Sequence, residues 1–358
     1  MTMSTRIYKS LGIMTGTSLD GIDLSIIKSD GSNKLTLIDG EVIKFSNKIR
    51  DSLKSVIGFK KRNKLIELVE LEYTNFVIKK IKNFLKINNH KIDIIGFHGQ
   101  TIFHNPKEKI SLQIGNPKRL YETFRVPIVY NFRMNDIING GNGAPLTPIF
   151  HDLLRRHLKL TSAAFLNLGG ISNITISDNK NLIAFDCGPC CSISNKFIYL
   201  KLKKEFDKSG FYASQGKHDY DIVSKLLKNK YFKKDPPKSL DVQEIDVSTI
   251  NSLNLNDGLA TINEFIAETI NLAINKFSIK INKIILLGGG RKNKDLKKRL
   301  NKKVNKIFLD IDDLKINGDL IESYAFAYLA IRSLKKMSLS FPKTTGVKRS
   351  ITGGDIII

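Results

Sequence analysis

Two stretches of the chain share one pattern, in which apolar runs flank a tight turn of glycines and small polar residues. The first is YKSLGIMTGTSLDGIDLSIIKSD, from Tyr8, and the second is AAFLNLGGISNITISDNKNLIAFDCGP, from Ala163. Each predicts a β-strand, a turn and a second strand. Because the strand–turn–strand unit occurs at residues 12–27 and again at 164–185, we expect two related lobes with a cleft between them.

Strands and helices alternate along the rest of the chain. Apolar residues recur three and four positions apart over Lys64–Ile87, which predicts a helix. LTLIDGEVIKF predicts a further strand pair, KIILLGGG a buried strand followed by a helix that opens near Asn293, and the C-terminal TGVKRSITGGDIII a returning strand. This alternation indicates an α/β protein.

The length and composition narrow the class of protein. A chain of 358 residues is long enough for about two domains. Its net charge of +24 invites a nucleic-acid partner, but lysine is enriched together with asparagine and isoleucine throughout, as AT-rich codons produce, and the basic runs lack interleaved aromatic residues. We therefore expect no nucleic-acid partner. The sequence contains no membrane-spanning run and no signal peptide, so we expect a cytoplasmic protein.

The turn GTSLDG combines groups that suit a phosphate. Its backbone N–H groups and the hydroxyls of Thr17 and Ser18 are hydrogen-bond donors, and Asp20 can hold a magnesium ion through water. An ordinary hairpin turn explains the same residues. The candidate phosphate-binding residues here are Gly16, Thr17, Ser18, Asp20 and Gly21.

Two later turns repeat the design. NLGGISNIT contains Asn167, Gly169, Gly170 and Asn173, and LLGGGRKN contains Gly288, Gly289, Gly290 and Asn293. Neither is a Walker A loop, and no GxGxxG motif opens a βαβ unit. Three glycine turns in two lobes fit a nucleotide, although a plain loop before a helix is the alternative for the third turn.

The segment IAFDCGPCC suggests two different chemistries. Cys187 and Cys190 spell the C-G-P-C of thioredoxin-like dithiols, whereas Asp186 could be the acid or base of a hydrolytic or transferase site. All three cysteines fall within five residues, which excludes a disulfide framework spread through the chain. A thiolate metal site is a third possibility.

Other polar residues gather between glycines. GFHGQTIFH contains His98 and Gln100, and NFRMNDIINGGNGAPLTPIFH contains Arg133, Asp136, Gly143, Ala144 and Pro145. A lone histidine is more often a packing or capping residue. Together, however, these groups suit a sugar, because each buried hydroxyl needs a hydrogen-bonding partner.

The order of motifs resembles the anhydro-N-acetylmuramic acid kinase family, of the actin, sugar-kinase and heat-shock-chaperone ATPase superfamily. The resemblance extends over nearly the whole chain. It rests on GIMTGTSLDGID, GFHGQTIFH, LQIGNP, FRMNDIINGGNGAPLTPIFH, LNLGGISNIT, FDCGP, PPKS, GGGRKN and GDLIESYAFAYLA. The pair of H-G-Q-T and G-x-G-A-P-L-x-P is the most specific part.

The resemblance implies a two-lobed actin-like ATPase fold (ribonuclease H-like) with a central interlobe cleft. We expect a first lobe of residues 1–130 plus 341–358 and a second lobe of residues 131–340. The implied reaction cleaves the 1,6-anhydro bond of the sugar and phosphorylates its 6-hydroxyl with ATP and Mg²⁺. A homodimer is possible.

The resemblance also assigns roles to residues. Asp186 matches the catalytic aspartate and needs no strongly perturbed pKa, since an ordinary carboxylate is ionised at neutral pH. Asp20 lies on the metal side, and the three turns bind ATP. The sugar contacts are His98, Gln100, Arg133, Asp136, the loop around Gly143, Ala144 and Pro145, and Glu322.

The sequence departs from the family pattern at several positions. Cys187 replaces a threonine, Cys190 and Cys191 replace a glycine and an asparagine, and Val242 stands where the family has an arginine. The C-G-P-C is then a coincidence rather than a dithiol site. Two alternatives stay open: another sugar or acyl kinase of the superfamily, and a catalytically impaired sugar-binding homologue.

Overall fold

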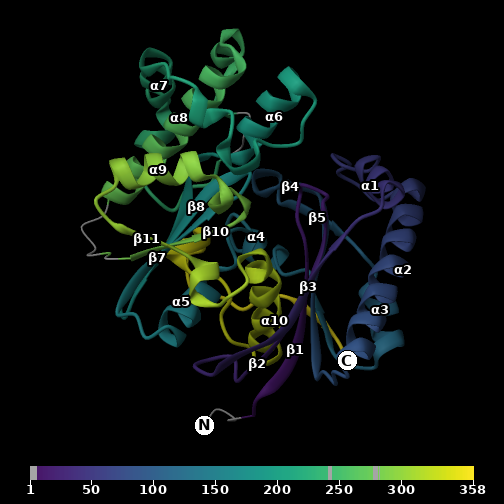
Figure 1. Ribbon diagram of the computed structural model, residues 1–358. Coiled ribbons are helices and arrows are strands. Elements are labelled where there is room, and N and C mark those ends of the chain that lie inside the picture. Colours follow the sequence, from purple (N-terminus) through teal and green to yellow (C-terminus); the bar gives the residue numbers. More distant parts are fainter. Residues whose placement is uncertain (1–5, 241–243, 277–280, 282) are drawn as a thin grey trace. The chain divides into compact units, whose positions relative to one another are not determined.

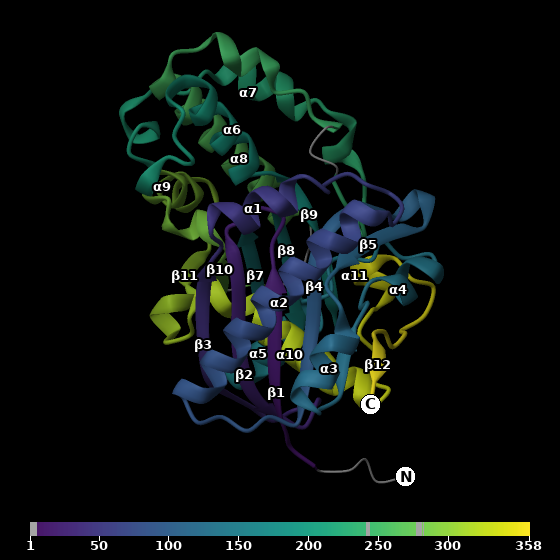
Figure 2. The same ribbon diagram turned by 90° about the vertical axis from the view of Figure 1, so that its right-hand side faces the viewer.

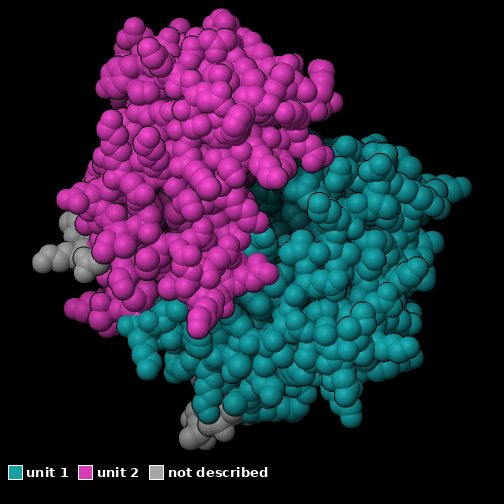
Figure 3. Space-filling model, in the orientation of Figure 1, with its two compact units in different colours: residues 1–159, 319–358 teal, residues 160–318 magenta. Residues whose placement is uncertain are grey.

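The computed structural model describes residues 6–240, 244–276, 281 and 283–358. The chain forms two compact units, which Figure 3 colours separately. Unit 1 contains residues 1–159 and 319–358, and unit 2 contains residues 160–318. Val242, one of the departures from the family pattern, lies outside the described residues.

Unit 1 is built on a seven-stranded sheet whose main path runs β12-β6-β4-β1-β2-β3. β2 lies antiparallel between β1 and β3. On the other side of β1, β4 is parallel to β1, and β6 is parallel to β4. β5 pairs with the far half of β4. The strands are β1 (Tyr8–Thr15), β2 (Gly21–Ser29), β3 (Leu35–Lys44), β4 (Ile94–Asn105), β5 (Ile110–Ile114), β6 (Ile128–Tyr130) and β12 (Asp355–Ile357).

Helices cover both faces of this sheet (Figures 1 and 2). α1 (Asn47–Lys54), α2 (Lys64–Ile87) and α3 (Pro117–Phe124) lie on one face, and α10 (Ile321–Leu334) lies on the other with α5 (Pro148–His157) beside it. The apolar stripe of α2 packs into the core at Ile66, Val77 and Ile81. The short helices α4 (Met134–Ile138) and α11 (Pro342–Thr345) complete the unit.

Glycines in the central strands allow α10 to lie unusually close to the sheet. A Cβ atom on Gly12 would collide with the Ser323 carbonyl, and one on Gly96 with the Phe326 carbonyl. The hydroxyl of Ser10 also donates to the Ala327 carbonyl at 2.8 Å. The close approach therefore depends on small residues in β1 and β4.

Unit 2 contains a five-stranded sheet in the order β11-β10-β7-β8-β9. β7, β8 and β9 form an antiparallel meander, and β10 and β11 extend it in parallel from β7. The strands are β7 (Ser162–Leu168), β8 (Ile171–Asp178), β9 (Leu182–Pro189), β10 (Lys283–Leu287) and β11 (Ile307–Asp310), and the helices are α6 (Cys191–Leu202), α7 (Tyr220–Leu227), α8 (Leu255–Asn275) and α9 (Lys294–Lys303).

The two sheets have the same strand order. In unit 1 the antiparallel strands β1, β2 and β3 are extended on the β1 side by β4 and β6, which are parallel to β1. In unit 2 the antiparallel strands β7, β8 and β9 are extended on the β7 side by β10 and β11, which are parallel to β7. This order is the ribonuclease H-like arrangement, so the predicted α/β fold with two related lobes is confirmed. No helix in the described part of the chain is long and apolar enough to cross a membrane.

The compact units have other boundaries than the lobes expected from the sequence, because residues 131–159 and 319–340 belong to unit 1, where α10 packs against β1, β2 and β4. One expectation about the fold is wrong. LTLIDGEVIKF forms the single strand β3 and not a strand pair. Asp39-Gly40 suggests a turn, but Gly40 continues the ladder opposite Ser25, and its missing side chain leaves room for Leu320.

Candidate functional site

The first glycine turn joins β1 to β2 in unit 1. Leu19 is buried and adopts a left-handed conformation with φ of 58°, which anchors the turn and leaves Thr17, Ser18 and Asp20 exposed. Gly16 accepts a hydrogen bond from the Leu19 N–H at 3.4 Å. The turn thus presents two hydroxyls and one carboxylate to solvent, as its sequence predicts. Gly21 has a structural role, because a Cβ there would collide with the Ile43 carbonyl of β3.

The second and third glycine turns lie next to each other in unit 2. A Cβ on Gly288 would collide with the Asn167 side chain, and one on Gly290 would lie 2.8 Å from the Leu168 carbonyl. Across the hairpin, Asn167 pairs with Asn173. The two turns that the sequence analysis assigned to the nucleotide are therefore neighbours at one edge of the sheet.

The start of α6 closes one side of the second turn. The Cys191 N–H donates to the Gly169 carbonyl at 2.9 Å, and both the N–H and the hydroxyl of Ser192 donate to the Gly170 carbonyl at 3.1 and 2.7 Å. These bonds fix the direction of the Gly169–Gly170 peptide groups. Cys191, which replaces the family's asparagine, lies beside both turns, since a Cβ on Gly290 would lie 3.0 Å from its sulfur.

Buried polar groups hold the third turn in place. The Arg291 guanidinium is 1% exposed; it donates to the Gly288 carbonyl at 3.0 Å and pairs with Asp312 at 2.8 Å. The side chain of Asn293 caps α9 by accepting from the Leu296 N–H at 3.0 Å. Asn293 therefore has a structural role in addition to the ligand contact expected from the sequence.

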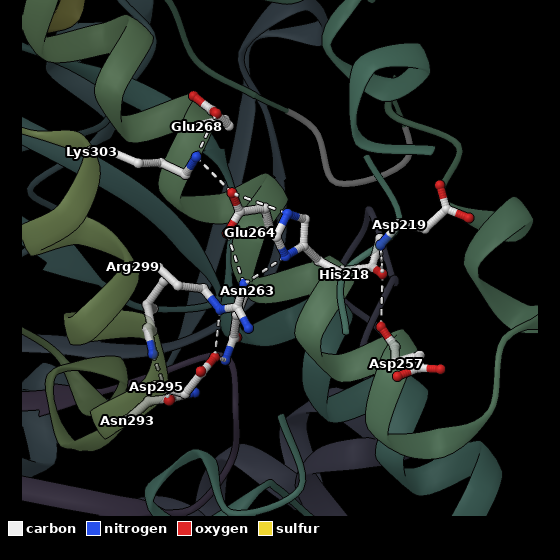
Figure 4. A network of polar contacts seen from close by, with 12 residues as sticks. His218, Asp219, Asp257, Asn263, Glu264, Glu268, Asn293, Asp295, Arg299 and Lys303 are labelled. Carbon is white, nitrogen blue, oxygen red and sulfur yellow. Dashed lines mark hydrogen bonds and ion pairs between the residues drawn. The ribbon is translucent and has the colours of Figure 1, made fainter. Parts of the chain in front are cut away.

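An ion-pair network fastens α9 to α8 (Figure 4). Arg299 contacts Asp295 at 2.7 Å and Glu264 at 2.8 Å, and Lys303 contacts Glu264 at 2.6 Å and Glu268 at 2.7 Å. Because both cations bridge two carboxylates and are partly buried, they constrain α9 more than isolated surface pairs do. The network stabilises the helix that begins directly after the third turn.

Asp186 lies near the end of β9 in a largely enclosed setting. One carboxylate oxygen accepts from the Leu240 N–H at 2.9 Å, and the Tyr231 hydroxyl donates to the Asp186 carbonyl at 2.7 Å. Burial raises the pKa of Asp186 to about 6, although the Leu240 hydrogen bond and the charge of Lys238 act against this rise. A role as general base does not require this rise, since an ordinary carboxylate is already ionised at neutral pH.

The setting of Cys187 and Cys190 disfavours the thiolate form that a reactive dithiol needs. Cys187 and Cys190 are both buried. Burial raises the pKa of the Cys187 thiol. The hydrogen bond with Cys191, and after it burial, raises the pKa of the Cys190 thiol. The sulfur atoms of Cys190 and Cys191 are 4.0 Å apart. The described residues contain no group of three or more His, Cys, Asp or Glu placed to hold a metal ion.

Gly143 and three other predicted sugar contacts are linked by hydrogen bonds in unit 1. Asp136 accepts from the Gly143 N–H at 2.6 Å, and Arg133 donates to the Gly143 carbonyl at 2.8 Å. Arg133 also donates to the His98 Nε2 through Nε and Nη2, at 3.1 and 2.9 Å. The sequence therefore identified residues that the fold brings together, although they come from β4 and from the segment around α4.

The hydrogen bonds of His98 define its tautomer. Nε2 accepts from Arg133, so Nδ1 carries the proton and donates to the Gly99 carbonyl at 2.7 Å. Burial, together with the charge of Arg133, lowers the pKa of His98 well below its usual range. His98 is therefore neutral at physiological pH and acts here as an acceptor for Arg133.

Gln100 has a buried oxygen atom, Oε1, that has no hydrogen-bonding partner among the described residues. Its Nε2 donates to the Gly16 carbonyl at 3.3 Å and to the Thr101 carbonyl at 3.0 Å. If the amide nitrogen and oxygen were exchanged, Oε1 would face these two carbonyl oxygens without a hydrogen atom between them. The hydrogen bonds therefore fix the orientation of the amide. Within the described residues nothing donates to Oε1. An unpaired buried acceptor is costly, and a ligand hydroxyl or N–H would satisfy it.

An acidic cluster in unit 1 includes one residue that the sequence analysis missed. Burial and the charges of Glu322, Asp319 and Asp20 raise the pKa of Asp23 to about 7. The pKa of Glu322 is raised as well, because the surrounding protein desolvates its carboxyl group, although the charge of Arg133 opposes this rise. Part of the Glu322 side chain remains exposed to solvent. The sequence signal that could have identified Asp23 is its position in β2, where a charged residue stands between the apolar residues Ile22 and Leu24.

Comparison with known proteins agrees with the motif pattern. The family model described as anhydro-N-acetylmuramic acid kinase matches residues 8–358. A curated protein of that name from Pelagibacter ubique is 40% identical over 370 residues, covering 98% of this chain and 99% of the relative. Another, from Zymomonas mobilis, is 36% identical over 361 residues, covering 97% and 99%.

Solved structures give only distant matches. A ROK family glucokinase from Streptomyces griseus has a TM-score of 0.43 at 11% identity, covering 90% of this chain and 99% of that chain. Component A of the Acidaminococcus fermentans (R)-2-hydroxyglutaryl-CoA dehydratase has a TM-score of 0.45 at 10% identity, covering 91% and 98%.

Proposed function

This chain belongs to the anhydro-N-acetylmuramic acid kinase family, and on that premise we propose how its residues perform the reaction. The enzyme opens the 1,6-anhydro bond of anhydro-N-acetylmuramic acid with water and transfers the γ-phosphoryl group of ATP to the 6-oxygen. The products are N-acetylmuramic acid 6-phosphate and ADP, as in the recycling of cell-wall sugars. The whole length of the curated relatives is covered, which favours this reaction over that of another sugar kinase.

Asp186 is the general base. Its carboxylate accepts a proton from a water molecule, whose oxygen forms a bond to the anomeric carbon C1. The bond between C1 and the 6-oxygen breaks, and the freed 6-oxygen attacks the γ-phosphorus. The bond from phosphorus to the bridging oxygen then breaks, and ADP leaves. With a pKa of about 6, Asp186 is about nine-tenths ionised at pH 7 and is a stronger base than an ordinary carboxylate.

The backbone of unit 2 supports the base. The Leu240 N–H donates to one carboxylate oxygen of Asp186 and so restricts rotation of the carboxylate. The Tyr231 hydroxyl donates to the main-chain carbonyl of Asp186 and holds the backbone of β9 at this residue. The neighbouring turns at Gly169–Gly170 and Gly288–Gly290 bind ATP. Phosphoryl transfer depends mainly on position and on charge neutralisation, which suits such turns better than a covalent nucleophile.

Magnesium fits the first turn of unit 1. Mg²⁺ is usually held by one or two carboxylates, with water and substrate phosphates as the other ligands. Asp20, with Asp23 nearby, supplies oxygen donors of this kind. Burial, and after it the charges of Glu322, Asp319 and Asp20, raises the pKa of Asp23, which supports a cation at this cluster. Magnesium supplies charge neutralisation of the phosphates.

The observation that carries the proposal is Asp186, held by Leu240 in the unit that contains two adjacent glycine turns. The test is sugar-dependent ADP release with purified protein, ATP and a panel of anhydro sugars and free sugars, with and without Mg²⁺. We expect release only with the anhydro-muramic sugar and Mg²⁺. A preference for a free hexose would indicate another sugar kinase, and tight sugar binding without ADP release would indicate an impaired homologue.

A further inference from the structure

Two adjacent cysteines lie beside the second and third glycine turns of unit 2. Cys190 is the N-cap residue of α6, and Cys191 is the first residue of that helix. The Cys191 sulfur is 3.6 Å from the carbonyl oxygen of Leu168, which directly precedes the second turn. A Cβ on Gly290 would lie 3.0 Å from the same sulfur. The sulfur of Cys191 therefore lies against the backbone of both turns.

The two thiols have different environments. Cys190 is fully buried in the core of unit 2, whereas Cys191 is partly exposed. Their sulfur atoms are 4.0 Å apart. The hydrogen bond with Cys190 lowers the pKa of Cys191, although burial opposes this effect, and the same contact raises the pKa of Cys190. Of the two sulfurs, that of Cys191 is therefore the one that ionises first.

This arrangement is typical of a redox-sensitive cysteine. The thiolate is the reactive form of a cysteine, and the N-terminus of a helix favours it. Redox-sensing cysteines are accessible to solvent and lie next to a second thiol, which resolves the first product of oxidation. Cys191 has both properties, and Cys190 is positioned as the resolving thiol.

The pair is a feature of this chain and not of the family pattern that it resembles. That pattern has a glycine and an asparagine at these two positions, and neither residue can form a disulfide. The third cysteine of the chain, Cys187, is buried, and burial raises its pKa. Sensitivity to oxidation is therefore expected at Cys191 first.

We propose that Cys190 and Cys191 form a peroxide-sensitive switch beside the nucleotide turns of unit 2. The Cys191 thiolate attacks one oxygen of hydrogen peroxide, the O–O bond breaks and hydroxide leaves, so that Cys191 becomes a sulfenic acid. The Cys190 sulfur then attacks the Cys191 sulfur, and the S–O bond breaks as the S–S bond forms. The hydroxyl group leaves with the Cys190 proton as water. Overall, two thiols are oxidised to a disulfide, and one peroxide is reduced to two molecules of water.

The disulfide acts on the second turn through the backbone. Adjacent Cα atoms are about 3.8 Å apart, whereas the Cα atoms that a disulfide joins are usually roughly 4.4–6.8 Å apart. Closing the bond therefore distorts the peptide group between the two cysteines. The Cys190 N–H donates to the Gly170 carbonyl and the Cys191 N–H to the Gly169 carbonyl, both at 2.9 Å. The distortion thus shifts the turn, and the inference rests on the proposed function because this turn is taken to bind ATP.

The test treats the full chain with hydrogen peroxide and measures both the bonds formed and the affinity for ATP. It compares wild type, Cys190→Ser, Cys191→Ser and Cys187→Ser, each with its own reduced form. In wild type we expect mass spectrometry to find a disulfide between Cys190 and Cys191. ATP affinity should fall at least about tenfold, as when hydrogen bonds to a charged ligand are lost, and should return after treatment with dithiothreitol.

The variants separate the steps of the switch. Cys190→Ser should stop at a sulfenic acid that dimedone traps on Cys191, and Cys191→Ser should form no disulfide and keep its ATP affinity. Cys187→Ser, the matched control, should respond to peroxide as wild type does.

Three results would overturn the inference: a bond between Cys187 and Cys190, a Cys191 that peroxide leaves unmodified, or a Cys190–Cys191 disulfide that leaves ATP affinity unchanged. An equal loss of affinity in Cys191→Ser would contradict it as well. If reduced wild type binds no ATP, the proposed function fails instead, and the mapping of the disulfide still tests the chemistry of the pair.

Discussion

The two units share one strand order but place their charged groups differently. In unit 1 the third residue of the second strand is Asp23, and Asp20 precedes it in the turn; in unit 2 the same strand position is the neutral Asn173. The main acid of unit 2 lies instead on the third strand, at Asp186. The two units therefore share a fold but differ in charge, which fits the proposal that the neutral turn of unit 2 binds phosphates and that the acids of unit 1 bind a cation.

The largest expected effect comes from removing the acid of the third strand. Asp186→Asn keeps the size of the side chain but removes the base, so turnover should fall by about 10²–10⁴-fold, the usual contribution of general-base catalysis. ATP affinity should stay within a few-fold, because other segments hold the phosphates. Steady-state kinetics and nucleotide titration measure both quantities.

The control for this variant is Asp221→Asn, which makes the same charge change on the exposed first turn of α7. It should have full activity. Full sugar phosphorylation by Asp186→Asn would contradict the assignment of the base.

The second prediction concerns a variant that gives unit 2 an acid at the strand position where unit 1 has Asp23. Asn173→Asp places a negative charge at the proposed phosphate turn, so we expect the KM for ATP to rise about 30-fold, equivalent to roughly 2 kcal/mol of repulsion at an effective dielectric constant near 20. The converse change, Asp23→Asn, should leave the KM for ATP within a few-fold. Equal effects of the two changes would show that the neutral turn has no special role.

The third prediction concerns pH. Asp186 must be ionised to act as a base, so kcat/KM should fall as the pH drops through about 6 and be level above about 7.5. The charge of Lys238 lowers this pKa, and Lys238→Met should therefore shift the acid limb to higher pH. We expect a several-fold loss at pH 6 and almost none at pH 8, and a limb near pH 4 in wild type would contradict this.

The smallest effect is expected at the neighbouring thiols. Cys187→Thr restores the family residue at a buried position, and turnover should change less than about twofold. Because Cys187 and Cys190 are buried, native-state alkylation followed by mass spectrometry should label both more slowly than Cys191. Efficient reduction of insulin disulfides by this protein would contradict the view that its C-G-P-C is incidental.

Local patterns predicted most of the secondary structure. The glycine turns, the helix at Lys64–Ile87 and the returning C-terminal strand are encoded within short windows, and each is present at or near the expected residues. Asn293 begins a helix, as its capping side chain suggests. These signals need no knowledge of distant contacts.

Long-range packing produced the errors. The assignment of α10 to unit 1 depends on Gly12 and Gly96, which are far from it in sequence. The strand pair expected within LTLIDGEVIKF is a single strand, and Leu320, which packs at Gly40, is equally distant from it in sequence. The sequence pattern around a glycine does not show which distant helix packs against it.

The same limit applied to the candidate site. Motifs identified His98, Arg133 and Asp136, but not the hydrogen bonds by which Arg133 and Asp136 hold Gly143. The pKa of Asp186 is raised by burial and lowered by the hydrogen bond from Leu240, and both effects exist only in the folded chain. Residue types can therefore be read from sequence, whereas their electrostatic environment requires the structure.

The central claim is that a carboxylate of unit 2 activates water for opening of the sugar while ATP supplies the phosphoryl group. The most direct measurement is the reaction in H₂¹⁸O, with rapid quenching and mass analysis of the sugar phosphate by fragment. We predict that the wild-type product contains one solvent oxygen at C1 and none in its phosphate, and that Asp186→Asn forms this product at least about 10²-fold more slowly. A product without solvent oxygen at C1, or an unchanged rate in Asp186→Asn, would contradict the account.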